Sequence, residues 1–118
     1  MKKTILTIAG LLLISLAPKV LHAQTYVLDK TIDLTGDGGY DYVSIDKANN
    51  RLYASHGTMV NVVDLATEKQ IGVIENMKGV HGIAIDNKAN RGFISDGKAN
   101  AVVAFDLKNI KNPGNHTG

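Results

Sequence analysis

Five side chains of this 118-residue chain have the chemistry and the spacing of a polar site. They are two histidines, two aspartates and a tyrosine: His56, His81, Asp96, Tyr40 and Asp41. Neighbouring imidazole and carboxylate groups can hold a metal ion, orient a small polar ligand or move a proton. The same residue types also cap turns and line solvated surfaces, and we favour that structural interpretation. We therefore predict these five as ligand-binding candidates only, with no catalytic residue and no resident metal or cofactor.

Three more specific functional motifs were considered, and the sequence lacks required residues or the required context for each. The stretch DLTGDGGYD, residues 33–41, has the composition of a calcium loop. However, Thr35 replaces its second acidic ligand, and Ser44 stands where the bidentate Glu belongs. Ser55 and Ser95 fall in predicted strands without the nucleophile elbow of a hydrolase. The GDGG sequence has neither the spacing nor the following helix of a phosphate-binding loop.

The elements that must position the five candidates occur twice in the sequence. Residues 42–57 align without a gap with residues 82–97, and residues 59–65 align with residues 101–107 after two extra residues. Nine of these 23 positions are identical: Ile45/Ile85, Asp46/Asp86, Asn50/Asn90, Arg51/Arg91, Ser55/Ser95, Gly57/Gly97, Val60/Val102, Asp64/Asp106 and Leu65/Leu107. A period of 40 to 42 residues is typical of propeller blades and of some helical arrays.

The pattern inside each copy favours strands. Short runs rich in β-branched residues alternate with Asn, Asp and Gly, and no window has apolar residues at helical spacing over three turns. The predicted strands cover residues 42–46, 51–56, 59–65 and 70–75 in the first copy, and 81–86, 91–96 and 101–107 in the second. Helical repeats are therefore excluded, and the chain is predicted to be all-β.

Each copy needs neighbours on both of its faces. The strands MVNVVDL and AVVAFDL carry apolar side chains on both sides, so both faces of each sheet require cover. Radial stacking of four-stranded antiparallel sheets supplies that cover and leaves only short edges. Asp64 and Asp106 end their strands where turns begin, and we predict that their carboxylates cap backbone N–H groups there.

The N-terminus has the order of a secretory signal peptide. Lys2 and Lys3 precede an apolar run of 13 residues, 5–17, and a short polar stretch ends at Ala23. The run is shorter than the roughly 20 residues that span a bilayer. Cleavage after Ala23 would remove three of the 13 basic residues and none of the 11 acidic ones, leaving a net charge near −1. The sequence thus predicts a periplasmic or secreted, cysteine-free protein and gives no indication of nucleic-acid binding.

The repeats resemble those of a known family. The stretches GDGGYDYVSID, GVHGIAID and FISDGKANAVVAFDL are similar to the YVTN-repeat β-propellers of bacteria, and in particular to their exported YncE-like members. The tetrapeptide that names the repeat corresponds to residues 53–56 and 93–96, and both copies are degenerate. The resemblance covers about residues 25–108 and implies a seven-bladed ring, without a common active site.

The resemblance also implies a domain organisation. Residues 1–23 are the signal peptide, 24–39 a ring-closing strand (residues 26–34) and linker, 40–79 the first blade and 80–118 an incomplete second blade. We expect the ring to be incomplete here and the sequence to be a fragment, the N-terminal piece of a longer protein whose later blades close the ring. The alternative is a short chain that builds the ring from several subunits. In such a ring the five candidates lie at the rim of the central channel.

Two functions remain open at this point. The first is an exported binding or scaffold module for a protein or small-molecule ligand, without catalysis. The alternative is a propeller-type, lactonase-like hydrolase with a metal at the central channel, which requires further acidic, amide or histidine ligands at the same rim.

Overall fold

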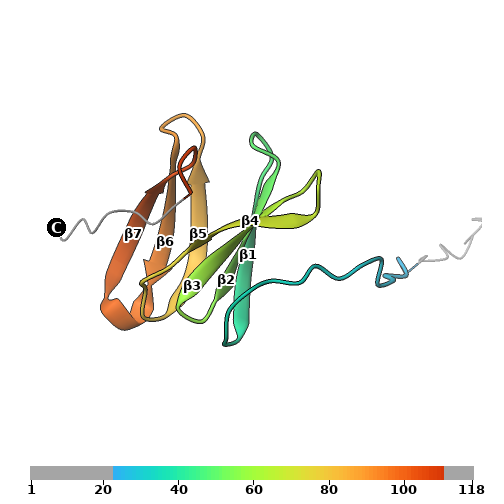
Figure 1. Ribbon diagram of the computed structural model, residues 1–118, viewed down its shortest axis with the longest axis horizontal. Coiled ribbons are helices and arrows are strands. Elements are labelled where there is room, and N and C mark those ends of the chain that lie inside the picture. The colour runs from blue at the N-terminus through green and yellow to red at the C-terminus, as the bar shows by residue number, and fades with distance from the viewer. Residues whose placement is uncertain (1–22, 111–118) are drawn as a thin grey trace, which may run out of the picture.

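The computed structural model describes residues 23–110, which fold into seven β-strands and one short 3-10 helix (Figure 1). The prediction of an all-β chain is confirmed for these residues. The elements are β1 (Tyr40–Asp46), β2 (Arg51–His56), β3 (Met59–Asp64), β4 (Lys69–Ile74), β5 (Val80–Asp86), β6 (Arg91–Asp96), η1 (Gly97–Ala99) and β7 (Ala101–Asp106).

The strands form two antiparallel sheets that follow the two sequence copies. The first sheet has the order β1-β2-β3-β4 and the second the order β5-β6-β7, so each strand pairs with the next along the chain. The seven strands predicted within the two copies agree with these bounds to within two residues, whereas η1 was not predicted. The described residues form no closed ring.

The turns between the first two strands of each sheet are built in the same way. Asn50 and Asn90 adopt left-handed backbone conformations, with φ of 53° and 55°. Asparagine tolerates this region better than most residues because its short side chain can hydrogen-bond locally. In each copy the carbonyl of this asparagine accepts a hydrogen bond from the leucine after the third strand, Leu65 or Leu107. The spacing that the two copies share in the sequence thus corresponds to the same hydrogen bond in both sheets.

The prediction for the two strand-ending aspartates is confirmed. One carboxylate oxygen of Asp64 accepts hydrogen bonds from the N–H groups two and three residues later, at 3.0 and 2.7 Å. Asp106 does the same at 2.7 and 3.0 Å. These hydrogen bonds hold the pKa of both carboxyl groups below its usual value. The repeated aspartates therefore stabilise turns.

The repeated serines hold a bulge at the start of each sheet. The register shifts within β1 between Tyr40 and Val43, and within β5 between Val80 and Ile83. The hydroxyl of Ser55 on β2 bonds both the N–H and the carbonyl of Tyr42 inside the first bulge. Ser95 on β6 does the same for Gly82. The serine repeat is thus explained by backbone groups that the bulge leaves unpaired.

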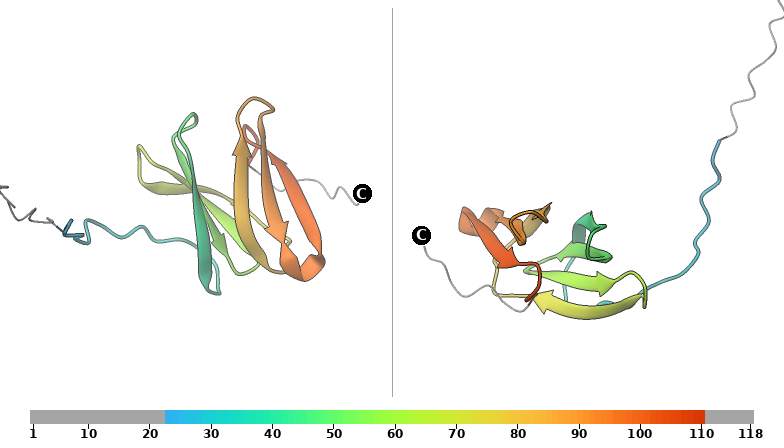
Figure 2. Two further views of the ribbon diagram at one scale, coloured as in Figure 1. Left: turned by 180° about the vertical axis from the view of Figure 1, so that it is seen from behind. Right: turned by 90° about the horizontal axis from the view of Figure 1, so that it is seen from above.

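The two sheets lie side by side (Figure 2), and the hydrophobic core is formed by residues of both. Strand β5 contacts β1 and β2, and the core cluster draws from both sheets. Its buried members are Tyr53, Val60, Val62, Ile74, Met77, Val80, Ile94, Phe105 and Leu107. One face of the first sheet is therefore covered by the opposite face of the second, as in stacked repeats.

Upstream of β1, Lys30 and Thr35 contact the first sheet or its turns, whereas Tyr26, Val27 and Leu28 are 79–89% exposed. The sequence predicts a strand over residues 26–34, but these residues have no regular structure, since a strand needs a partner and none pairs with them in the described part of the chain. An ion pair of 2.7 Å between Lys30 and Glu68 fastens the segment to the turn between β3 and β4. The predicted signal peptide, apart from Ala23, lies outside the described residues. Among residues 23–110 we find no helix with the length and hydropathy needed to cross a membrane.

Candidate functional site

The five candidate residues lie at the same end of the two sheets. Tyr40 at the start of β1 pairs with His56 at the end of β2, and Val80 at the start of β5 pairs with Asp96 at the end of β6. Asp41 and His81 follow the first residues of β1 and β5. Antiparallel pairing therefore brings the candidates to one end, but the contacts divide them into three groups.

His56 is buried, with both ring nitrogens engaged. Its Nε2 lies 3.0 Å from the carbonyl oxygen of Gly38, and its Nδ1 lies 3.0 Å from Oδ1 of Asn61. The amide nitrogen of Asn61 donates to the carbonyl of Thr35, which fixes the orientation of its oxygen toward the histidine. The ring of Tyr40 stacks on the imidazole with centroids 4.1 Å apart. Because both nitrogens bond within the protein, His56 fastens residues 35–38 to the first sheet.

Asp96 is the counterpart of His56 in the second copy and has a similar task. It is buried, and its two carboxylate oxygens accept hydrogen bonds from the N–H groups of Lys78 and Gly79, at 2.9 and 2.8 Å. Asp96 therefore holds the linker that enters β5, as His56 holds the linker that enters β1. The two residue types differ because Asp96 accepts hydrogen bonds from N–H groups, whereas the ring of His56 faces the carbonyl of Gly38.

His81 and Asp41 form the accessible part of the site. Nδ1 of His81 lies 2.7 Å from a carboxylate oxygen of Asp41, and the two side chains are 54% and 43% exposed. The pair joins β5 of one sheet to β1 of the other. The imidazole is also close to Gly97, where a Cβ would lie 3.2 Å from its ring. A carboxylate on Nδ1 orients the ring and leaves Nε2 directed away from it, so the pair can bind a polar group or exchange a proton with one.

The structure separates the candidates rather than assembling one cluster. The described residues contain no group of three or more histidine, cysteine, aspartate or glutamate side chains placed to hold a metal ion. The loop of residues 33–41, considered above as a calcium loop, instead supplies the backbone partners of His56 and Asn61.

The sequence analysis missed several polar residues that connect the first sheet to the segment before β1 or to the second sheet. We term these two sets of contacts the joints. Asn61 is fully buried in β3 and bonds Thr35, Gln70 and His56. At the opposite end of the sheets, Asn87 of the second copy donates to Asp46 at 3.1 Å and accepts from Asn49 at 3.0 Å.

Asp46 is the charged centre of this second joint. Burial alone would raise its pKa, but hydrogen bonds from the side chain and backbone of Asn49 and from Asn87 outweigh burial and lower the pKa below its usual value. The ionised carboxylate is therefore the form that ties the two sheets together.

A signal for these residues was present in the sequence as differences between the copies. Asn61 corresponds to Val103, Asn49 to Ala89 and His56 to Asp96. Shared residues such as Ser55 and Asp64 maintain each sheet, whereas Asn61 and Asn49 make contacts that their counterparts Val103 and Ala89 cannot make. Asp46 is shared by both copies, so a comparison of the copies would have identified only part of these contacts.

No protein-family model and no curated protein sequence matches the chain.

Proposed function

We propose that the chain is an exported repeat protein of the YVTN, YncE-like kind, in which each sheet is a propeller blade and the end with Asp41 and His81 binds a small polar ligand or a partner protein. The observation that carries this proposal is the repetition of structural hydrogen bonds. The bonds of Ser55, Asn50 and Asp64 recur at Ser95, Asn90 and Asp106. Equivalent sheets that stack face to face are what a propeller requires.

The binding part of the proposal rests on exposure. His56 and Asp96 are occupied by backbone and amide partners, whereas the pair of His81 and Asp41 is about half-exposed. The pair also bridges two sheets, which is where ligands of stacked repeat proteins gain contacts from both neighbours. The signal peptide and the periplasmic or secreted location remain proposals that follow from residues 1–23.

The test is a titration of the isotopically labelled protein, followed by backbone amide shifts in NMR. The probes are a divalent zinc salt, a simple lactone and a peptidoglycan oligosaccharide, one at a time. We expect saturable shifts confined to residues near His81 and Asp41 for at least one probe, and their loss in His81→Ala with unchanged thermal stability. Shifts confined to other regions, or none with any probe, would contradict the binding proposal. Turnover of the lactone that disappears in His81→Ala would support the hydrolase alternative instead.

A further inference from the structure

The chain contains two Asp-Gly sequences, Asp37-Gly38 and Asp96-Gly97. Such a pair has a specific reactivity, because the amide nitrogen of the glycine can attack the carboxyl group of the aspartate and close a five-membered ring. Glycine favours this reaction because it has no side chain to shield its nitrogen and its backbone reaches many conformations. The reaction needs a free carboxyl group, a free N–H and a backbone that can move. The surroundings of each pair therefore decide whether it reacts.

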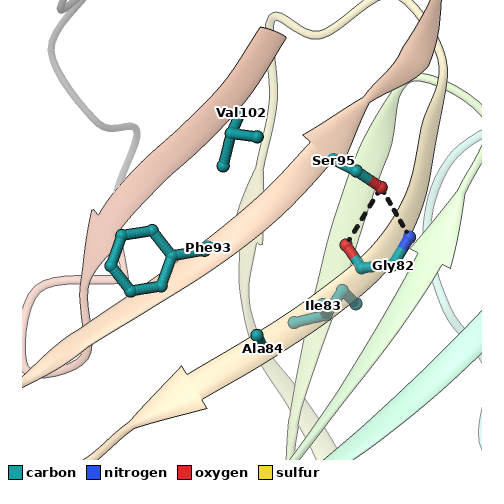
Figure 3. A pocket seen from close by; sticks show the side chains of 6 residues that line it. All are labelled: Gly82, Ile83, Ala84, Phe93, Ser95 and Val102. Atoms are coloured by element: carbon teal, nitrogen blue, oxygen red, sulfur yellow. Dashed lines mark hydrogen bonds between the residues drawn. The ribbon is translucent and has the colours of Figure 1, made fainter.

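At Asp96-Gly97 every group that the reaction needs is engaged. Asp96 is 3% exposed, and its two carboxylate oxygens accept hydrogen bonds from two backbone N–H groups at 2.9 and 2.8 Å. The N–H of Gly97 donates to the carbonyl of Gly79 at 2.9 Å. The preceding residue, Ser95, bonds the N–H and the carbonyl of Gly82, as Figure 3 shows. Ring closure at Asp96 therefore requires that this part of the second sheet opens first.

The pair Asp37-Gly38 differs in each of these respects. Asp37 is exposed, and its carboxylate makes no hydrogen bond or ion pair within residues 23–110. The N–H of Gly38 also has no hydrogen-bond partner in that part of the chain. Residues 36–38 form bends without regular structure, and Gly36 and Gly38 have φ of 111° and 118°. Glycines on both sides of Asp37 thus give the backbone the freedom that ring closure needs.

Asp37 lies between two attachments of the segment before β1 to the first sheet. On one side of it, the carbonyl of Thr35 accepts a hydrogen bond from the buried amide of Asn61 at 2.8 Å. On the other side, the carbonyl oxygen of Gly38 lies 3.0 Å from Nε2 of His56. A change in the length of the backbone at residue 37 must therefore disturb the joint that these contacts form.

We propose that Asp37 is a site of spontaneous isomerisation to isoaspartate, and that this modification releases the segment before β1 from the first sheet. The nitrogen of Gly38 forms a bond to the side-chain carboxyl carbon of Asp37. The neutral carboxyl group loses its hydroxyl and the nitrogen loses its proton, so one water molecule leaves.

Water then adds to the cyclic imide and opens it in one of two ways. If the bond between the nitrogen and the side-chain carbonyl breaks, aspartate is restored. If the bond between the nitrogen and the original main-chain carbonyl breaks, the main chain continues through the side-chain carbons and isoaspartate results. The water lost in the first step is regained in the second, so the mass of the chain is unchanged.

The isoaspartyl product has one more carbon atom in its main chain and a carboxylate directly on the Cα of residue 37. Because only Gly36 and Asp37 separate the attachments at Thr35 and Gly38, the added atom must displace at least one of them. The inference goes beyond the proposed function, since it involves neither export nor ligand binding.

The test is tryptic peptide mapping of the full chain after prolonged incubation in neutral buffer at physiological temperature. Trypsin cleaves after lysine and arginine, so residues 31–47 carry Asp37 and residues 92–98 carry Asp96. Electron-transfer fragmentation distinguishes isoaspartate from aspartate at each position. In the folded chain we expect more than about tenfold more isoaspartate at residue 37 than at residue 96, since Asp96 reacts only in the fraction of molecules that have opened locally.

Two controls accompany the mapping. In concentrated urea, where the contacts of Asp96 are lost, the two positions should react at similar rates, because the fold and not the Asp-Gly sequence protects Asp96. Asp37→Glu keeps the exposed charge but requires a less favourable six-membered ring, so the modification of residue 37 should disappear. Equal isoaspartate at the two positions of the folded chain, or none at residue 37, would overturn the proposal.

Hydrogen exchange measures the release of the segment. The isoaspartyl form is separated from the native form by hydrophobic-interaction chromatography, and amide exchange is followed by NMR in both. Gly57 donates to the carbonyl of Gly39 at 3.0 Å, and Gly97 makes the equivalent bond to Gly79 in the second copy. We expect several-fold faster exchange at Gly57 in the isoaspartyl form and unchanged exchange at Gly97. Equal protection of Gly57 in the two forms would overturn the proposed release.

Discussion

Gly92 lies directly opposite Phe105 in the ladder between β6 and β7, and the phenyl ring fills the space that a side chain at residue 92 would need. A Cβ there would lie 2.1 Å from Cζ of Phe105. In the first sheet the corresponding pair is Leu52 and Val63. The two copies therefore fill the same position with a large and a small residue in opposite order.

Gly92→Ala should lower the free energy of unfolding by roughly 1–3 kcal/mol, because the buried ring must move out of a packed position. Urea denaturation followed by circular dichroism measures the change. The double variant with Gly92→Leu and Phe105→Val, which reproduces the pair of the first copy, should recover most of the loss. An unchanged midpoint for Gly92→Ala would contradict this account of the packing.

Tyr53→Phe should raise the free energy of unfolding by up to about 1 kcal/mol. The hydroxyl of Tyr53 is buried and makes no hydrogen bond of normal geometry among the described residues. Burial raises its pKa, although hydrogen bonding and charge from the nearby Arg51 guanidinium act in the opposite direction. The second copy has Phe93 at this position. Thermal denaturation compares the variant with Tyr42→Phe, a control at an exposed position. A clear loss of stability in Tyr53→Phe alone would show that the hydroxyl bonds a partner.

Asn61→Val should lower the free energy of unfolding by about 2–3 kcal/mol. The change introduces the residue type of Val103 but leaves the carbonyl of Thr35 and Nδ1 of His56 without their amide partner. As a contrast, Lys30→Ala removes the exposed ion pair with Glu68 and should cost less than about 1 kcal/mol. Equilibrium unfolding in urea gives both values. The opposite ranking would mean that the segment before β1 is held by charge rather than by the asparagine.

Acid should weaken the fold through three aspartates, Asp46, Asp64 and Asp106, whose pKa values are lowered in the folded chain. A carboxyl group with a lowered folded pKa contributes stability that is complete above its unfolded value, near 3.9. That contribution is lost as the pH falls through the folded value. Urea midpoints should therefore be steady from about pH 7 to about pH 5 and should fall below about pH 4.

Asp46→Asn isolates the carboxylate at the joint between the sheets. The variant keeps an oxygen that can accept from Asn49 and Asn87, but it no longer titrates, so its stability should depend less on pH below about pH 4 than that of the unmodified chain. A stability that increases on acidification, or equal pH dependence in both proteins, would contradict the assignment.

The strands were predictable because the information for them is local. The short runs 51–56 and 91–96, each bounded by Asn at position 50 or 90 and by Gly at position 57 or 97, indicate hairpins without reference to the rest of the chain. The capping of turns by Asp64 and Asp106 is local in the same sense, since the partners are two and three residues away.

The contacts between distant segments were not predictable in this way. His56 and Asp96 were chosen by residue type, but their partners, Gly38 and the N–H groups of Lys78 and Gly79, are backbone groups that residue type does not reveal. The predicted strand over residues 26–34 has a strand-like pattern, but pairing depends on a partner outside that pattern. The contact of Asp41 with His81 required the packing of β1 beside β5, 40 residues apart.

The serine-held bulges, asparagine turns and aspartate caps have a consequence for how such a chain can change in length. Each of these bonds begins and ends within one copy, so a tandem duplication of about 40 residues would bring its own partners with it and leave no backbone group of the older copies unpaired. Substitutions such as Asn61 for Val103 can then follow one at a time at the new joint. Growth by whole copies therefore leaves existing hydrogen bonds intact, while insertion of a single residue into β1 or β5 would reverse the orientation of the side chains beyond it in that strand.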